Sequence, residues 1–226
     1  STYPEIFTKI HENIEKSPII DLGSLNEYPL SIIDEGLSER FISCHPIAGS
    51  EKSGIDNSDS EIFRGKKFIA SFTKNSNIDK NTKVLEDITK IIGSDLQILD
   101  KKEHDKIFAL ISHLPQFLSF LSNDVSPALN DSESLKRAFR LDSSNPAIWS
   151  DIFEINSKNI ESYYSEFFNN LCDMIEAIDS GNYNLINQEI SKNSLMSNGN
   201  LQDINKITEL ELSKQMQHVK QVFSIT

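Results

Sequence analysis

The sequence lacks several patterns that mark particular classes of protein. Its two cysteines, Cys44 and Cys172, are too few for a disulfide framework or a zinc site, so we expect no metal. No apolar run is long enough to span a bilayer, and the first residues carry no signal-peptide pattern. The 22 Lys and Arg residues against 34 Asp and Glu residues give a net charge of -12, without a basic cluster. We therefore expect a cytoplasmic protein that binds neither nucleic acid nor membrane.

Glycine-rich phosphate-binding motifs are also missing. None of the eight glycines forms a G-x-G-x-x-G or P-loop pattern, in which backbone N–H groups surround a phosphate. The first expected element is a helix, and the first strand comes after it. If the strand-and-helix half binds a nucleotide, we expect the segment that holds the pyrophosphate to be absent from this chain.

Strands and helices alternate over the first 100 residues. Apolar periodicity and the Pro and Gly positions that interrupt it predict the elements, and alternation of this kind predicts a parallel α/β sheet. We assign residues 1–100 to a partial α/β domain. The expected helices are 3–16, 30–37 and 81–92, with Gly93 as a stop signal, and the expected strands are 19–22, 41–43, 68–72 and 96–99.

After residue 100 the strand patterns end, and residues 101–226 read as an all-helical domain. Pro115 lies inside the first long helix and should bend or divide it, because proline removes a backbone donor. The expected helices are 101–121, 147–178, 183–190 and 201–223, with a short segment at 135–141.

The expected helix 147–178 is apolar on more than one side. A helix on a protein surface buries a single apolar stripe, so a helix with two such sides must lie between neighbours. In a domain of this size a second copy of the chain is the expected neighbour, which predicts a homodimer. The apolar positions are Ile148, Trp149, Ile152, Phe153, Ile155, Ile160, Tyr163, Tyr164, Phe167, Phe168, Leu171, Met174, Ile175 and Ile178.

The chemistry is concentrated in the stretch Cys44–Gly54. His45 follows the apolar run Phe41–Ser43, so it is expected where a strand gives way to a loop, with its ring directed into the hollow of that loop. Pro46 disfavours helix at His45 and holds it extended. In open α/β sheets, ligands bind at the carboxyl ends of strands.

Five blocks of sequence together resemble the prephenate dehydrogenase family, NAD(P)-dependent enzymes of tyrosine biosynthesis. The resemblance extends from about Pro4 to the end of the chain. It implies a dinucleotide-binding, Rossmann-like domain followed by an all-α dimerisation domain, and oxidative decarboxylation of prephenate to 4-hydroxyphenylpyruvate. The blocks are Asp21–Ser24, His45–Gly54, Phe63–Lys67, His104-Asp105 with Ser112–Pro115, and Asn145–Ile152.

The resemblance also implies roles for particular residues. His45 would accept the proton of the substrate hydroxyl, which a neutral imidazole can do. Ser24 would orient that histidine beside the nicotinamide of NAD or NADP. Arg140 matches the arginine that binds the substrate carboxylate, and a planar guanidinium suits that task. The remaining pocket residues implied by the family are His113, Ser112, Glu51 and Gln116.

The sequence departs from the family pattern at several positions. Gln116 replaces a second histidine and can hydrogen-bond without carrying charge. Asn26 stands where a lysine is common, Arg137 where an acidic residue is common, and Phe139 where a threonine is usual. These differences, with the missing pyrophosphate segment, favour a second interpretation in which the chain is a truncated, non-catalytic remnant. Such a remnant would dimerise and bind prephenate, arogenate or tyrosine.

Each candidate residue also has an ordinary structural interpretation. Ser24 fits a turn. Arg140 and Glu51 fit solvated surface charges. His113 lies among apolar residues and fits a buried core histidine, and His104-Asp105 fits capping and dipole interactions at a helix start.

Overall fold

The computed structural model describes residues 3–14, 16–49, 55–125, 146–188 and 191 of the chain. The chain divides into two compact units, Ser1–Glu161 and Ser162–Thr226. The first unit contains the sheet and the helices that surround it. Within the described ranges, no helix has the length and apolar character needed to cross a bilayer.

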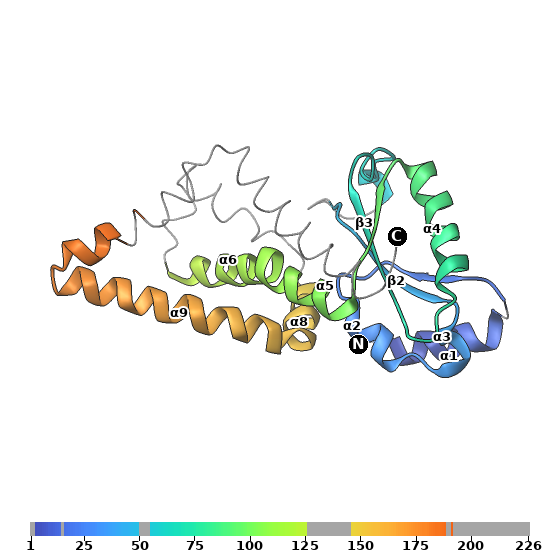
Figure 1. Ribbon diagram of the computed structural model, residues 1–226, viewed down its shortest axis with the longest axis horizontal. Coiled ribbons are helices and arrows are strands. Elements are labelled where there is room, and N and C mark those ends of the chain that lie inside the picture. Colours follow the sequence, from blue (N-terminus) through green and yellow to red (C-terminus); the bar gives the residue numbers. More distant parts are fainter. Residues whose placement is uncertain (1–2, 15, 50–54, 126–145, 189–190, 192–226) are drawn as a thin grey trace. The chain divides into compact units, whose positions relative to one another are not determined.

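Four strands form one mixed sheet in the order β1-β2-β3-β4 (Figure 1). The pairs β1–β2 and β3–β4 are parallel, whereas β2 and β3 are antiparallel. The fully parallel sheet that we predicted is therefore wrong for the central pair. The described part of the β2–β3 connection holds the 3₁₀ helix η1 (Ile55–Asn57) and no α-helix of the kind that usually forms a parallel crossover. The strands are β1 (Ile19–Asp21), β2 (Phe41–Pro46), β3 (Lys67–Phe72) and β4 (Asp95–Ile98).

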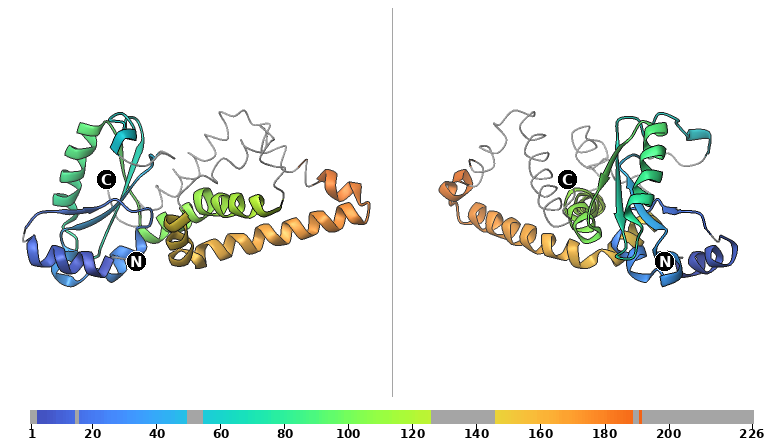
Figure 2. Two further views of the ribbon diagram at one scale, coloured as in Figure 1. Left: turned by 180° about the vertical axis from the view of Figure 1, so that it is seen from behind. Right: turned by 45° about the vertical axis from the view of Figure 1, so that its right-hand side comes forward.

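Helices cover both faces of the sheet, and α4 lies along one side of the strands in Figures 1 and 2. One buried cluster joins Phe7, Leu30 and Leu37 of the helices to Ile19 and Phe41 of the strands. On the other face, Leu85 of α4 packs with strand residues that include Ile42, Cys44, Phe68 and Ala70. The helices of this unit are α1 (Tyr3–Asn13), α2 (Glu27–Ile32), α3 (Glu35–Ser38) and α4 (Ile78–Ile92).

Side-chain caps explain where these helices begin and end. The predicted helix 30–37 is in fact two helices, because Asp34 starts α3 by accepting a hydrogen bond from the Leu37 N–H at 3.0 Å. Asn77 caps α4 in the same way through the Lys80 N–H, so this helix begins earlier than predicted. Gly93 ends α4 with φ of 70°, which confirms the predicted stop.

The helix predicted around Pro115 is divided into three segments. α5 (Lys101–Phe108) is followed by the π-helical segment η2 (Ala109–His113) and by α6 (Leu114–Val125). Pro115 lies in the first turn of α6, where its missing N–H is tolerated best. The wider π turn directly before it confirms that the helix is interrupted near the proline, and π turns are common at functional sites.

The predicted helix 147–178 is also divided, which corrects that prediction. α8 (Pro146–Ile155) and α9 (Ser157–Asp179) meet at Asn156, which is not helical. Residues 183–188 are helical, as predicted. The predicted segments 135–141 and 201–223 lie outside the described residues.

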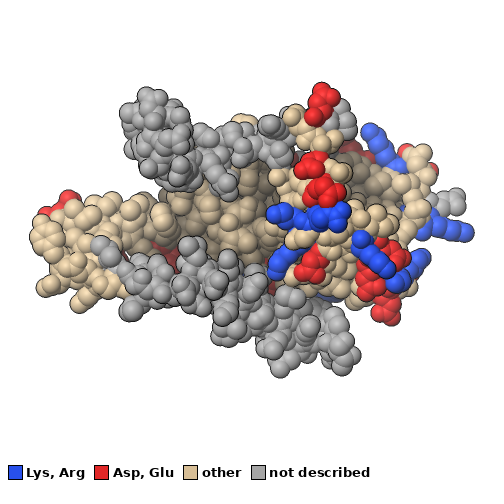
Figure 3. Space-filling model, turned by 90° about the horizontal axis from the view of Figure 1, so that it is seen from above, with Lys and Arg blue, Asp and Glu red and all other residues tan. Residues whose placement is uncertain are grey.

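Charged side chains of both signs are interspersed over the α/β part of the molecule in the view of Figure 3. On α4, for example, Lys83 lies 3.5 Å from Glu86 and 3.6 Å from Asp87. These side chains are exposed, so such pairs add little to stability and mainly keep the surface solvated.

Candidate functional site

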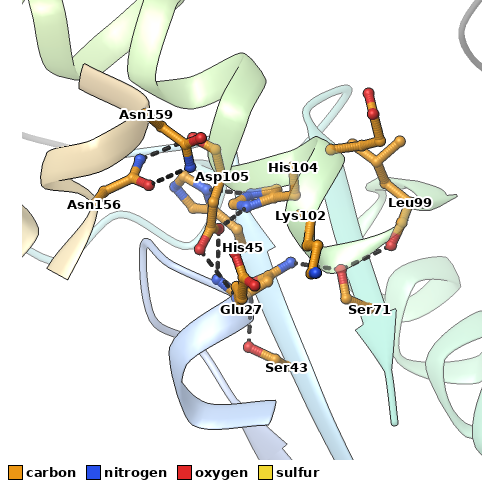
Figure 4. Close-up of polar contacts among 12 residues, drawn as sticks. Glu27, Ser43, His45, Ser71, Leu99, Lys102, His104, Asp105, Asn156 and Asn159 are labelled. Carbon is orange, nitrogen blue, oxygen red and sulfur yellow. Dashed lines mark hydrogen bonds and ion pairs between the residues drawn. The ribbon is translucent and has the colours of Figure 1, made fainter. Parts of the chain in front are cut away.

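His45 lies inside β2 and is the first member of a buried polar chain (Figure 4). It pairs with Ile69 of β3, so the strand extends further than predicted. Its ring does not point into the following loop. Instead, His45 Nδ1 lies 3.0 Å from Nε2 of His104, and His104 Nδ1 lies 2.7 Å from Oδ1 of Asp105. Strand β2 and helix α5, which follows β4 in the chain, thus bring two imidazoles and a carboxylate together.

The Asp105 carboxylate is held by backbone donors at the start of α2. The Asn26 N–H donates to Oδ1 at 2.8 Å, and the Glu27 N–H donates to Oδ2 at 3.0 Å. Asp105 itself is 2% exposed. Its helix is fixed by Asp100, which caps α5 by accepting from the N–H groups of Lys102 and Glu103. Three donors therefore converge on one buried carboxylate, which is the condition for keeping such a charge inside a protein.

The Asn26 side chain links this carboxylate to the interior strands. Asn26 Nδ2 donates to Ser71 Oγ at 2.9 Å, and Asn26 Oδ1 accepts from Ser43 Oγ at 3.1 Å. Ser71 in turn donates to the Leu99 carbonyl at 2.8 Å. Because the Asn26, Ser43 and Ser71 side chains are joined to one another, the network fixes the position of α2 against β2 and β3.

A second buried centre forms where the long helix is interrupted. Asn156 Nδ2 donates to the Asp105 carbonyl at 2.8 Å and lies 3.0 Å from His113 Nδ1. Asn159 Nδ2 donates to Asn156 Oδ1 at 2.7 Å, which fixes the orientation of the Asn156 amide. The break between α8 and α9 thus supplies the residue that joins His113 to the turn carrying Asp105. The ring of Trp149 lies edge-on to that of His113, with centroids 6.1 Å apart.

His45 and His113 are held neutral. Burial lowers the pKa of His45 to about 3, with His104 and His113 as further causes. Burial also lowers the pKa of His113 to about 4, although the Asp105 carboxylate acts in the opposite direction. At neutral pH each imidazole therefore carries a lone pair that can accept a proton or a hydrogen bond.

Ser24 lies between β1 and α2 and lines a cavity of about 220 Å³. Tyr3, Tyr28 and Asp151 contribute polar groups to the same cavity, and Ile152 belongs to its apolar wall. Among the described contacts, none joins Ser24 to His45. The predicted cooperation of Ser24 with His45 therefore stays a prediction.

The other predicted pocket residues have different placements. Ser112 is half-buried in η2 next to the buried His113, and Gln116 is buried in the first turn of α6. These three residues therefore share one stretch of interrupted helix. Arg140 and Glu51 lie outside the described residues, so the predicted convergence of Arg140 with His45 stays a prediction.

Three residues of the centres had no role assigned from the sequence. The pair His104-Asp105 belongs to a block of the family resemblance and also fitted a helix cap, but Asp100 provides that cap and the pair is buried. A usable signal was the spacing of His104 and Phe108, which places them on one face of α5, where their rings stack with centroids 4.5 Å apart. Asn156 had no such signal, since it interrupts an otherwise continuous apolar pattern.

In the part of the chain that the structure describes, no three His, Cys, Asp or Glu side chains gather as a metal site would require. The polar chain thus consists of hydrogen-bonding groups.

Comparison with family models divides the chain close to the end of β4. Residues 2–98 match the prephenate dehydrogenase nucleotide-binding domain, and residues 100–192 match the prephenate dehydrogenase dimerisation domain. The contact-based units divide at Glu161 instead, with α5 packed against α2 of the sheet region. The predicted domain boundary at residue 100 therefore stays a prediction.

Curated relatives match at moderate identity. The chain is 28% identical over 170 residues to prephenate dehydrogenase of Bacillus subtilis, covering 70% of this chain and 45% of that protein. It is 27% identical over 173 residues to cyclohexadienyl dehydrogenase of Zymomonas mobilis, covering 72% of this chain and 59% of that protein. The matches thus span about half the length of these relatives.

A solved structure gives the same result for the fold. The structure of prephenate dehydrogenase from Aquifex aeolicus in complex with hydroxyphenyl propionate and NAD+ has a TM-score of 0.76 and 26% identity, covering 93% of this chain and 73% of that chain. The predicted fold, a Rossmann-like α/β domain followed by a helical domain, is confirmed. Together the two family models account for most of the sequence, and the chain belongs to the prephenate dehydrogenase family.

Proposed function

We propose that the protein takes part in NAD(P)-dependent oxidative decarboxylation of prephenate to 4-hydroxyphenylpyruvate. The observation that carries the proposal is the half-buried, neutral imidazole of His45 near the carboxyl end of β2 in a chain of this family. Open α/β sheets bind ligands at this position. A histidine whose pKa lies well below neutrality is already in its basic form when the substrate arrives.

The residues of this chain would act on the hydroxyl end of the substrate. As the ring carbon loses hydride, its hydroxyl becomes a carbonyl and must give up a proton, which His45 accepts. Carbon dioxide leaves from the opposite ring carbon, and formation of the aromatic ring favours both events. A bound nicotinamide cofactor supplies the hydride acceptor.

The cofactor would be NAD or NADP, with the nicotinamide end near Ser24. The polar groups in the cavity beside Ser24 fit that end of the cofactor. The described residues do not fit the pyrophosphate, because no glycine-rich turn is present among them. We therefore assign only the nicotinamide end to residues of this chain.

The substrate is a small carboxylate, prephenate or arogenate, and tyrosine would fit the same pocket. His113 and Ser112 would line that pocket, with Gln116 behind them in α6. Arg140 and Glu51 are assigned by resemblance alone, Arg140 to the carboxylate and Glu51 to the polar network. A guanidinium is suited to this task because it binds both carboxylate oxygens at once.

The protein would act as a homodimer through α9. Large apolar side chains on this helix are exposed, as the family's dimerisation domain would require. They include Phe167, Phe168, Leu171, Ile175 and Ile178.

Calorimetry and a rate assay on the full chain test the proposal. NAD, NADP, prephenate and tyrosine are each titrated into the protein, and NADH or NADPH formation is then followed with prephenate and either cofactor. Turnover supports the proposal. Carboxylate binding without turnover would support the non-catalytic alternative, and absence of both would contradict any role at this site.

A further inference from the structure

The hydrogen-bond chain from Asp105 to His45 determines where each proton lies. A carboxylate only accepts hydrogen bonds, so His104 Nδ1 must donate to Asp105 Oδ1 across their 2.7 Å contact. In a neutral His104 the other nitrogen, Nε2, then carries a lone pair and accepts. His45 Nδ1 lies 3.0 Å from it and must therefore be the donor. This order leaves the lone pair of His45 on Nε2.

We propose that His104 and Asp105 are positioning residues that hold His45 in the tautomer with an unprotonated Nε2. That nitrogen is the one able to take the proton of the substrate hydroxyl. The catalytic meaning of this tautomer rests on the proposed function, whereas the tautomer itself is a property of the free protein. The family resemblance includes the pair among its blocks but assigns it no role.

The surroundings of His104 leave it little alternative. Its side chain is fully buried, and its ring stacks on Phe108 at an interplanar angle of 28°. The Asp105 carboxylate is itself held by two backbone donors: the Asn26 N–H donates to Oδ1, which His104 also contacts, at 2.8 Å, and the Glu27 N–H donates to Oδ2 at 3.0 Å. A flipped His104 ring would place C–H groups where its two nitrogens now meet Asp105 and His45, so both hydrogen bonds would be lost. The packing thus allows one orientation of the ring.

The same chain provides for the charge that catalysis would create. When Nε2 of His45 accepts a proton, the ring becomes an imidazolium whose Nδ1–H still donates to His104. His104 is hydrogen-bonded both to that ring and to the Asp105 carboxylate, so the carboxylate stabilises the positive charge through these two hydrogen bonds. The titratable groups that act on His45 are His104 of α5 and His113 of η2, and Asp105 of α5 lies beyond His104 in the hydrogen-bond chain. Of these only Asp105 carries negative charge, so it is the group that offsets the new positive charge.

Nitrogen-15 NMR of the imidazoles in the full chain, without ligand, tests the tautomer directly. The spectra are recorded for the wild type, Asp105→Asn and His104→Gln, with Asp95→Asn as an exposed control of the same chemistry. We expect His45 Nε2 to resonate as an unprotonated nitrogen and Nδ1 as a protonated one in the wild type and the control. In both test variants we expect a mixture of the two tautomers.

Each result decides the proposal. A wild-type His45 with its proton on Nε2 would overturn it, and so would an unchanged tautomer in a folded His104→Gln protein. If Asp105→Asn fails to fold, the wild-type spectrum and His104→Gln still give the answer.

Kinetics separate this inference from the proposed function. If the chain turns over prephenate, both variants should lower kcat by at least about 10-fold with little change in KM, because neither residue contacts the substrate. Equal kcat in His104→Gln and wild type would contradict the positioning role. If the wild type shows no turnover, the proposed function is wrong. The NMR spectra still show whether His45 adopts the proposed tautomer.

Discussion

The region around β2 and α5 buries polar side chains, whereas helix α9 exposes apolar ones. Near β2, His104 and Asp105 are 0% and 2% exposed, and their polar groups are paired. On α9, Phe168 and Leu171 are 48% and 43% exposed. Buried polar groups persist only where their partners are already in place, whereas exposed apolar groups mark a surface that binds something else. The polar groups of the first region thus find their partners within one chain, whereas we expect the second to bind a second copy of the chain.

Two leucine truncations should show the largest difference between the regions. Leu85→Ala empties a position that is 0% exposed beneath the sheet, and should lower the free energy of unfolding by about 2–5 kcal/mol. Leu171→Ala on α9 should lower the stability of the single chain by less than about 1 kcal/mol. Urea denaturation at low protein concentration measures both values. Equal losses would contradict the contrast in burial.

The contrast was only partly predictable from the sequence. Periodicity identified α4 and its glycine stop because local propensity and burial agree there. It placed His45 correctly near the end of a strand, but the direction of its ring depends on His104, which is 59 residues away in the chain. The break at Asn156 depends equally on contacts with Asp105 and His113. Local patterns carry no information about such distant partners.

The two buried histidines should make stability depend on pH. The pKa is about 3 for His45 and about 4 for His113 in the folded chain, below the ordinary value of 6.5. The unfolded chain therefore binds more protons below pH 6.5, and stability should fall as pH decreases toward 4. Between pH 7 and 5 the loss should be at most about 2 kcal/mol for each histidine.

Denaturation of His45→Asn at both pH values checks this dependence. The variant should be less sensitive to acid than the wild type, whereas His11→Asn, at an exposed position on α1, should match the wild type. A wild-type stability that is constant from pH 7 to 5 would show that the imidazoles are not held neutral.

Removing the Asn156 side chain tests whether the polar region depends on this break between helices. Asn156→Ala leaves the Asp105 carbonyl and His113 Nδ1 without this donor, which should lower the free energy of unfolding by about 1–3 kcal/mol. Asn159→Ala removes only the outer hydrogen bond and should have a smaller effect. A larger loss in Asn159→Ala would show that the order of the network is wrong. Thermal unfolding of both variants provides the comparison.

The exposed side of α9 should affect assembly and leave the stability of the single chain nearly unchanged. Leu171→Glu places a charge in the apolar surface and should shift the protein from dimer to monomer in sedimentation experiments at micromolar concentration. Ile91→Glu, at a position of α4 that is 82% exposed, should remain dimeric. If the wild type is a monomer, or if Leu171→Glu forms a dimer as stable as that of the wild type, α9 is not a dimer interface.

The rate of His45→Asn with prephenate and NAD or NADP tests the central claim most directly. General-base catalysis contributes about 100-fold or more, so kcat should fall by that factor while the dissociation constant for prephenate stays close to the wild-type value. The far-ultraviolet circular dichroism should remain that of the wild type. A folded His45→Asn protein that turns over prephenate at the wild-type rate would contradict the assignment of His45 as the base.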